Sequence, residues 1–393
     1  MARPKVLLGM SGGVDSSVAA LLLTEQGYEV EGVTLQVWEH EDETAATSKK
    51  WQERGCCKVG IARHVAKRLN IPHRVVDTRE RFQKSVVDDF ISGYLAGTTP
   101  NPCVRCNERV KFGMLYGLAQ SSRADYVATG HYAQIIQSAH AYGLHQGIDA
   151  KKDQSYFLYR IARSWLPHIL FPVGGLEKAE VWKRAGDLDL PVDELKESQE
   201  ICFVTQGDYR EFLKIQAPAA QQPGSFVDTA GRHIGEHQGI AFYTPGQRKG
   251  LGVATGERVY VKEVIPETNR VVLGSSEDLL QTTCRVSDLN WFEDSVEEGQ
   301  TVSVKYRYAS PSVTAVLHRE SAEVVTLEFS RPQQAISPGQ SAVFYRANQV
   351  LGGGIIQRAN LPNKQEIPLY HTNAPIPSGE KSANSTRVLQ STG

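Results

Sequence analysis

The stretch Val6-Leu7-Leu8-Gly9-Met10-Ser11-Gly12-Gly13-Val14-Asp15-Ser16-Ser17 decides the fold that we expect for this chain. Its apolar start predicts a short buried strand, and residues 18–23 predict a helix that ends near Gly27. A strand, a Gly/Ser-rich turn and a helix form a phosphate cradle, because backbone N–H groups and the helix dipole face the same anion. Asp15 is unusual in such a cradle. A carboxylate beside phosphates indicates a bridging cation such as Mg²⁺.

The spelling of this loop excludes two common nucleotide-binding motifs. The chain has no G-x-x-x-x-G-K-[ST] motif, the loop is not G-x-G-x-x-G, and the cradle contains no lysine. Residues 11–17 resemble instead the PP-loop of ATP pyrophosphatases, which cleave ATP between its α and β phosphates. The alternative is a Ser/Gly turn that only joins a strand to a helix.

Length and composition define the class of protein. The chain has 393 residues, of which 40% are hydrophobic and 22% charged, and a net charge of −1. These values are typical of a globular protein with two or three domains. The charge excludes a broadly basic nucleic-acid binder, so any RNA contact would use local patches. We expect no secretory signal and no membrane span, and therefore a reducing, cytoplasmic setting in which unpaired cysteines are more often chemical than structural.

Strand and helix patterns alternate through the first half of the chain. Strands are predicted at residues 6–9, 29–37, 73–76 and 126–129, and helices at residues 59–69, 82–94, 108–119 and 177–188. This alternation predicts an α/β fold with a Rossmann-like parallel sheet of the adenine nucleotide alpha hydrolase type. Ligands gather at the carboxyl ends of such strands. Leu35, Gly130 and His131 are expected at that edge, although His131 fits a packed surface histidine as well.

The pattern changes after Tyr209, where short strands and turns dominate. We predict a catalytic domain over residues 1–207, a small α+β central domain over 208–278 and a C-terminal β-barrel over 279–362. The central domain is expected to contain hairpins at residues 225–234 and 259–273. Residues 363–393 are predicted to be a disordered tail and residues 40–54 a mobile surface loop.

Two cysteine-bearing segments stand out. The prolines at 100 and 102 exclude a helix before Cys103, which would place Cys106 near the N-terminus of the helix at 108–119. That position, between Arg105 and Arg109, favours a reactive thiolate. Two alternatives are half of a zinc site shared with Cys56 and Cys57, and a thioredoxin-like dithiol. Cys202 lies between apolar residues, as a buried core cysteine would.

A set of motifs in fixed order resembles the tRNA-specific 2-thiouridylase family. The motifs span almost the whole chain: residues 9–17, 99–102 with 106–107, 129–133, 152–157, 198–203, 246–250, 337–342 and 351–354. The resemblance implies ATP-dependent 2-thiolation of the wobble uridine of tRNA. AMP would be attached to the C2 oxygen of the base, and sulfur would replace that oxygen, with release of AMP and pyrophosphate.

The resemblance also assigns roles to residues. It implies that Cys202 carries a persulfide, that Cys106 is the nucleophile, and that the two form a transient disulfide. The residues implied to bind ATP are Gly9, Met10, Ser11, Gly12, Gly13, Val14, Asp15, Ser16, Leu35 and Gly130, with Asp15 a tentative Mg²⁺ ligand. Those implied to contact tRNA are Asn101, Pro102, Cys103, His131, Lys152, Asp153, Gln154, Arg307, Tyr308 and Gln340.

Departures and open points accompany this assignment. The family often has Asp where this chain has Cys103, and a thiol is a weaker acceptor than a carboxylate. The basic pairs Arg105/Arg109, Lys151/Lys152, Arg248/Lys249 and Lys305/Arg307 are candidates for phosphate contacts. The resemblance implies tRNAs for Lys, Glu and Gln as substrates, and a cysteine desulfurase or sulfur relay as donor. Alternatives are a PP-loop ligase or amidotransferase acting on a small molecule, and an RNA-binding protein without activity.

Overall fold

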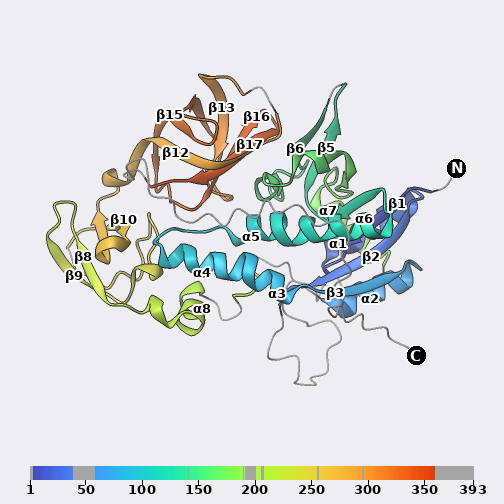
Figure 1. The fold of residues 1–393 in the computed structure, drawn as a ribbon, viewed down its shortest axis with the longest axis horizontal. Coiled ribbons are helices and arrows are strands. Elements are labelled where there is room, and N and C mark those ends of the chain that lie inside the picture. Colours follow the sequence, from blue (N-terminus) through green and yellow to red (C-terminus); the bar gives the residue numbers. More distant parts are fainter. Residues whose placement is uncertain are drawn as a thin grey trace, which may run out of the picture.

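The N-terminal domain is built on a five-stranded parallel sheet, as a computed structural model shows (Figure 1). The structure describes residues 3–38, 58–139, 141–188, 190, 201–204, 208–254, 256–293 and 296–358. The sheet order is β3 (His73–Asp77), β2 (Glu29–Gln36), β1 (Lys5–Gly9), β4 (Tyr126–Thr129) and β7 (Ile169–Leu170). All neighbouring pairs are parallel. The predicted Rossmann-like sheet is therefore confirmed.

Alternate residues of β1 face two separate cores, as a parallel sheet with helices on both faces requires. Val6 and Leu8 pack against α1 (Val14–Glu25), α2 (Val59–Arg68) and α7 (Lys178–Gly186). Leu7 packs on the opposite face, against two helical segments. One of them follows β3, and the other follows the loop at residue 100. Burial of each such side chain contributes about 1.5–3 kcal/mol.

Two long helical segments cover that second face. The first comprises α3 (Arg79–Phe82), a π-helical turn (Gln83–Val87) and α4 (Asp88–Leu95). The second comprises α5 (Pro102–Arg105), a π-helical turn (Cys106–Phe112) and α6 (Gly113–Ser122). The predicted start of the second helix near residue 108 was wrong. Proline is tolerated at the first helical position, and the Asn101 side chain caps the helix by accepting from the Val104 N–H at 3.3 Å.

The central domain contains a four-stranded sheet in the order β10-β11-β8-β9. Its strands are β8 (Gly224–Val227), β9 (His233–His237), β10 (Tyr260–Ile265) and β11 (Arg270–Gly274), and both predicted hairpins are present. Helix α8 (Tyr209–Gln216) connects this domain to the core of the first one.

The C-terminal domain is a closed barrel, as predicted. Its strands are β12 (Leu280–Trp291), β13 (Gln300–Lys305), β14 (Val313–Arg319), β15 (Val325–Gln334), β16 (Ser341–Arg346) and β17 (Gln349–Ile356), and the pairing of β12 with β17 closes it. A hairpin from the N-terminal half, β5 (Ala133–Gln137) and β6 (Tyr142–Gln146), adds to β17. The sequence analysis did not predict this hairpin.

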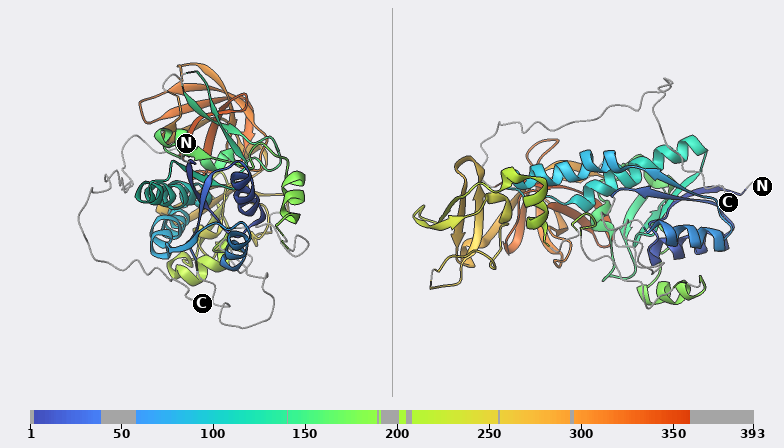
Figure 2. Two further views of the ribbon diagram at one scale, coloured as in Figure 1. Left: turned by 90° about the vertical axis from the view of Figure 1, so that its right-hand side faces the viewer. Right: turned by 90° about the horizontal axis from the view of Figure 1, so that it is seen from below.

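The three domains form an elongated molecule, with the parallel sheet at one end and the central domain at the other (Figures 1 and 2). The barrel lies alongside the helices that connect these ends. The predicted loop 40–54, Cys56, Cys57 and the tail 363–393 fall outside the described residues. None of the helices described here is long and apolar enough to cross a membrane.

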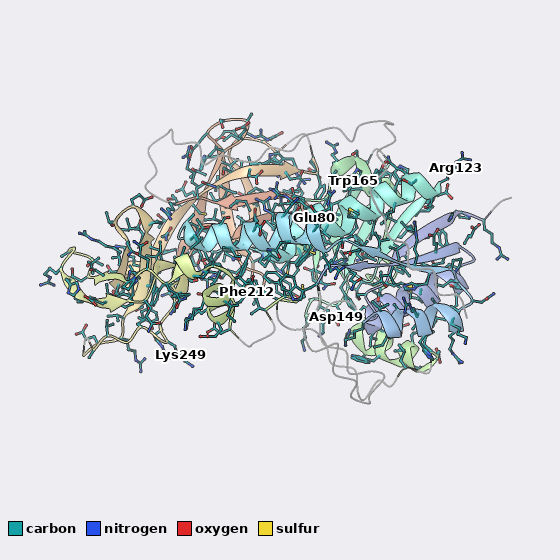
Figure 3. All side chains as sticks on the ribbon, turned by 60° about the horizontal axis from the view of Figure 1, so that its bottom comes forward. Glu80, Arg123, Asp149, Trp165, Phe212 and Lys249 are labelled. Atoms are coloured by element: carbon teal, nitrogen blue, oxygen red, sulfur yellow. The ribbon has the colours of Figure 1, made fainter. Side chains whose placement is uncertain are left out.

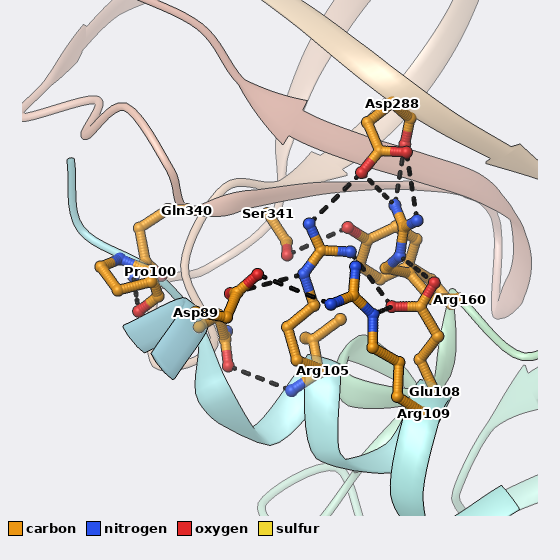
Figure 4. A network of polar contacts seen from close by, with 12 residues as sticks. Asp89, Pro100, Arg105, Glu108, Arg109, Arg160, Asp288, Gln340 and Ser341 are labelled. Atoms are coloured by element: carbon orange, nitrogen blue, oxygen red, sulfur yellow. Dashed lines mark hydrogen bonds and ion pairs between the residues drawn. The ribbon is translucent and has the colours of Figure 1, made fainter. Parts of the chain in front are cut away.

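A network of charged side chains joins the barrel to the second long helix (Figure 4). Asp288 of β12 accepts from Arg160 at 3.1 Å and from Arg105 at 3.4 Å. Glu108 contacts the same two arginines, at 2.9 Å from Arg160 and 3.1 Å from Arg105. The side chains of Arg105 and Arg160 are only 14% and 11% exposed. Because screening by water is weak there, each charge depends on its partners.

Asp288 has an unusual backbone conformation and a lowered pKa, and the two arginines that it contacts cause the latter. Asp288 has a φ of +51°, a left-handed conformation that Asp tolerates better than most residues. Burial by itself raises the pKa of this carboxyl, but the positive charges of Arg160 and Arg105 outweigh burial and hold the pKa below its ordinary value. Asp288 is therefore ionised in the folded protein.

Replacing Asp288 by Asn should destabilise the protein by about 2 kcal/mol, because two mostly buried arginines lose a carboxylate while the left-handed backbone remains allowed. Urea unfolding of the full chain measures the change. Glu80→Gln is the matched control, since Glu80 pairs with Lys84 on an exposed helix face. Equal unfolding midpoints for Asp288→Asn and the control would contradict a stabilising role for the network.

Candidate active site

The loop between β1 and α1 has the shape of a phosphate cradle. Gly12 adopts a φ of +77°, and α1 begins at Val14 with Gly13 as its N-cap. The Ser16 and Ser17 hydroxyls each donate to the Gly13 carbonyl at 3.0 Å, which holds the turn together. Backbone N–H groups of the turn and the first helical turn therefore converge as an anion site requires.

Gly130 brings the end of β4 against this loop. A Cβ atom on Gly130 would lie 2.6 Å from the Ser16 nitrogen and 2.7 Å from the carbonyl carbon of Asp15. β1 has β2 on one side and β4 on the other, so the chain changes direction along the sheet at this point. A ligand crevice is expected at such a switch point. Leu35 lies near the carboxyl end of the neighbouring strand β2, so the structure brings all three predicted ATP segments to one edge.

Asp15 faces two groups that sequence reasoning missed. The Tyr132 hydroxyl donates to Asp15 Oδ1 at 2.7 Å, and the Lys178 ammonium lies 2.6 Å from the same oxygen. Lys178 is 163 residues from Asp15 in the chain. Its only sequence signal was its place at the start of the predicted helix 177–188. Among the described residues, no group of three or more His, Cys, Asp or Glu side chains could hold a metal ion.

Phe203 anchors the second cysteine segment. Its ring lies in an aromatic cluster, 5.2 Å from Phe212, 5.3 Å from Phe90 and 5.7 Å from Phe82 between ring centroids. Phe203 is buried, whereas the adjacent Cys202 is partly exposed. The aromatic side chain therefore fixes the backbone while the thiol next to it stays accessible.

Cys202 lies close to the second long helical segment, residues 102–122, which carries Cys103 and Cys106 and is called the cysteine helix below. The pKa of the Cys103 thiol is raised to about 11, first by loss of hydration and second by the nearby Cys202 thiol. Cys106 follows one turn after Cys103, where the π-helical turn begins, and its side chain is buried. Cys103 is exposed to solvent, Cys106 is buried and Cys202 is partly exposed. The interaction seen joins Cys202 to Cys103, and the pairing of Cys106 with Cys202 stays a prediction.

The positive charges expected beside Cys106 are engaged elsewhere. Arg105 pairs with Glu108, Asp89 and Asp288, and Arg109 contacts Asp89 at 3.7 Å (Figure 4). Cys106 also lies in the second turn of its helix rather than at the N-terminus, because the helix starts at Pro102. The lowered thiol pKa was predicted from a helix N-terminus at Cys106 and from available charges on Arg105 and Arg109. The structure has neither arrangement.

His131 and Lys111 connect the cradle to the thiols. His131 follows Gly130, is buried, and pairs through Nδ1 with the Thr129 hydroxyl at 2.6 Å. Burial, and then the positive charge of Lys111, hold the pKa of His131 well below its ordinary value, so the ring is neutral. The positive charge of Lys111 also lowers the pKa of the Cys103 thiol, although loss of hydration and Cys202 outweigh it. Lys111 is therefore close to both His131 and Cys103.

The residues predicted to contact tRNA occupy varied environments. Gln340 of the barrel donates to the Thr99 carbonyl at 2.9 Å, which ties the barrel to the 99–102 loop. Tyr308 is exposed, with its ring 4.4 Å from that of Phe157. Gln154 accepts from the Tyr132 N–H at 3.0 Å. Asp153 is buried and accepts from the Ser155 N–H and hydroxyl, both at 3.0 Å, so it organises this turn.

The four basic pairs differ in their availability. Arg105 belongs to the ion network, Lys305 pairs with Asp153 at 3.6 Å, and Arg307 donates to the Ala335 carbonyl. Arg248 and Lys249 are exposed, and Figure 3 places Lys249 at the outer edge of the central domain. Internal pairing therefore removes part of the phosphate-binding capacity that the sequence suggested.

The family models match all three domains. Models described as "tRNA methyl transferase HUP domain", "tRNA methyl transferase PRC-barrel domain" and "Aminomethyltransferase beta-barrel domain" match residues 4–206, 210–275 and 281–356. A protein of Carboxydothermus hydrogenoformans named tRNA-specific 2-thiouridylase MnmA is 46% identical over 363 residues, which cover 91% of this chain and 98% of that protein. The chain belongs to the MnmA family of 2-thiouridylases.

Other relatives in the MnmA family agree. The protein of the same name from Moorella thermoacetica is 45% identical and covers 89% of this chain and 99% of its own length. A solved 4-thiouridine synthetase in complex with RNA and ATP covers 55% of this chain and 50% of its own, at 18% identity with a TM-score of 0.34. The family assignment depends on the full-length relatives alone.

Replacing Gly130 by Ala should weaken nucleotide binding at least tenfold. The added methyl group meets backbone atoms of Ser16 and Asp15, which can only yield if the cradle moves. Binding of ATP to the full chain, measured by calorimetry, tests this expectation. Gly117→Ala in α6 is the control, since its Cβ meets nothing within 4 Å. Unchanged affinity in Gly130→Ala would show that this edge does not hold the nucleotide.

Cys103 is exposed to iodoacetamide, and its alkylation should keep accelerating up to about pH 11, because the surrounding protein and Cys202 raise the pKa of this thiol. Below that pH the rate should rise about tenfold per pH unit, since the thiolate is the reactive form. Mass spectrometry of the Cys103 peptide measures the rate, with guanidinium-unfolded protein as the reference. A plateau at the same pH in folded and unfolded protein would contradict the assigned environment.

Proposed function

We propose that this protein is a tRNA-uridine 2-sulfurtransferase that converts the wobble uridine of tRNA to 2-thiouridine at the expense of ATP. The observation that carries the proposal is full-length similarity to named 2-thiouridylases, at 42–46% identity over about nine-tenths of the chain. The geometry supports it, because Gly130 packs against the phosphate cradle, and Lys111 lies near both the adjacent His131 and the Cys103 thiol.

The cradle supplies activation of the base. A uracil C2 carbonyl is a poor electrophile, and attack of its oxygen on the α-phosphorus of ATP forms an adenylated base, with loss of the N3 proton and release of pyrophosphate. Residues 9–16, Leu35 and Gly130 bind the nucleotide in this scheme. A wobble base must leave its stack to reach both the nucleotide and the thiols, and enzymes that modify bases commonly extrude them.

The thiols supply the sulfur. The terminal sulfur of a Cys202 persulfide attacks C2, and AMP leaves with the former C2 oxygen. Cys106 as thiolate then attacks the inner sulfur of Cys202, which breaks the S–S bond to the transferred sulfur and leaves the thiocarbonyl on the base. The resulting Cys106–Cys202 disulfide needs a two-electron thiol reductant, which a reducing cytoplasm supplies.

Mg²⁺ completes the nucleotide site in this proposal. Asp15 fits a Mg²⁺ ion that is held mainly by ATP phosphates and water, because such sites need only one or two protein carboxylates. When bound, the ion neutralises phosphate charge. The proposal extends to tRNAs for Lys, Glu and Gln and to a cysteine desulfurase or sulfur relay as the donor.

Other functions fit the site less well. A small-molecule ligase or amidotransferase with a PP-loop needs no pair of thiols, and a binding protein without activity needs no cradle. The matching family models carry the word methyl transferase in their descriptions. Methyl transfer needs neither of the two cysteine segments. One of these is anchored by Phe203, and the other belongs to the helix at 102–112.

Incubation of unmodified tRNA with ATP, Mg²⁺ and a persulfide donor should produce 2-thiouridine at the wobble position, detected by mass spectrometry of nucleosides. Cys106→Ser and Cys202→Ser should each abolish it, since each removes a sulfur atom that the reaction requires. Pyrophosphate release should survive in Cys202→Ser for a single turnover, because adenylation precedes sulfur transfer in the scheme, whereas AMP release should be lost with the sulfur that displaces it.

Cys284→Ser is the control for these variants. Cys284 is a buried thiol in the barrel, and burial alone raises its pKa to about 12. Its replacement should leave thiolation unchanged. Thiolation by Cys106→Ser or Cys202→Ser at the rate of the unmodified protein would refute the sulfur-transfer scheme, and absence of 2-thiouridine with every donor would refute the function.

A further inference from the structure

The phosphate cradle acquires a lysine from a distant part of the chain. Residues 11–17 contain no lysine, unlike many nucleotide loops in which a lysine meets the phosphates. In the folded protein, Lys178 places its Nζ atom 2.6 Å from Asp15 Oδ1, inside that loop. Lys178 is the first residue of α7, which packs beside α1.

Burial, a backbone hydrogen bond and two aromatic rings fix the position of Lys178. The residue is only 8% exposed. Its backbone N–H donates to Asp149 Oδ2 at 3.0 Å, which holds the start of α7. Its ammonium lies 5.5 Å from the centre of the Tyr132 ring and 5.2 Å from that of Trp182. A long flexible side chain is thereby confined to a polar corner between aromatic rings.

The surroundings indicate which end of the nucleotide this corner faces. Leu35, Cys106 and Phe203 belong to the core on one face of the sheet. Helices α1 and α7 belong to the core on the opposite face. In phosphoryl transfer the attacking and leaving oxygens are roughly in line with the phosphorus. A base that approaches from the thiol side therefore sends pyrophosphate toward Lys178.

We propose that Lys178 is the phosphate-binding lysine of this site, and that its ammonium contacts the β- and γ-phosphate oxygens of ATP and the departing pyrophosphate. This inference rests on the proposed function, which supplies ATP as the substrate. Before nucleotide binds, Asp15 holds the ammonium in place. Phosphate oxygens carry more negative charge than one carboxylate, so the ammonium can exchange one partner for the other over a short distance.

The test compares ligands that differ in their phosphates. Calorimetry on the full chain, with Mg²⁺, measures the Kd for ATP, pyrophosphate and AMP. Lys178→Met should weaken ATP and pyrophosphate by roughly 10- to 100-fold, the effect of losing one charged hydrogen bond. AMP has no β- or γ-phosphate, so its Kd should stay within about twofold, and Lys178→Arg should restore most of the loss.

Lys183→Met is the matched control, since it removes an exposed lysine from the same helix. ATP binding at unchanged affinity in Lys178→Met overturns the inference, and so does an equal loss for AMP and ATP, which would assign Lys178 to ordering the loop alone. If the unmodified protein binds no ATP, the proposed function fails and the inference with it. If it binds ATP and only the Lys178 effect is absent, the proposed function stands.

A second variant covers the case in which Lys178→Met folds poorly. Asp15→Asn removes the carboxylate that competes for the ammonium, so it should tighten pyrophosphate binding several-fold in EDTA. That gain should shrink when Asp15→Asn is combined with Lys178→Gln, which keeps a polar side chain but removes the ammonium charge. A gain of the same size in both backgrounds would show that Lys178 does not contact the phosphates.

Discussion

The charged network around Asp288 is the constraint on which the arrangement of the site depends. Arg105 stands one residue before Cys106, and Arg160 follows the turn that contains Asp153. Both reach the same carboxylate on the barrel. Because these charges are mostly buried, the barrel cannot shift away from the cysteine helix without exposing unpaired charge. Gln340 adds a neutral contact from the barrel to the loop before that helix.

The parallel sheet supplies the second condition. The strand order places the carboxyl ends of β1, β2 and β4 side by side, so that Gly130 touches the loop that contains Asp15. No side chain larger than hydrogen fits between them. Helices from both faces then send residues to this edge: Lys178 from α7 and Lys111 from the cysteine helix. In the proposed function, residues from opposite faces of one sheet thus contact the nucleotide and the persulfide.

The chemistry of the thiols follows from solvation as much as from charge. Cys103 stays protonated at neutral pH because loss of hydration and a neighbouring thiol disfavour its anion. The arginines beside Cys106 are committed to carboxylates. Lys111 is therefore the positive charge that the structure brings to this cluster. Phe203, held among aromatic rings, restrains the Cys202 backbone without covering the thiol.

Short-range patterns in the sequence were enough to predict the local elements and the identity of the cradle. Residues 6–17 specify a strand, a turn and a helix through short-range apolar periodicity and glycine conformation, and the alternating elements that follow specify a parallel sheet. The error of the prediction was local as well. The helix at 102 begins earlier than predicted, because Asn101 caps it and proline is tolerated at its first position. Only the tertiary structure decided that Lys178 meets Asp15, that Arg105 serves the barrel, and that the β5–β6 hairpin joins β17. These pairings join residues up to about 200 positions apart, and no local pattern encodes such contacts, because they arise only when separate elements pack.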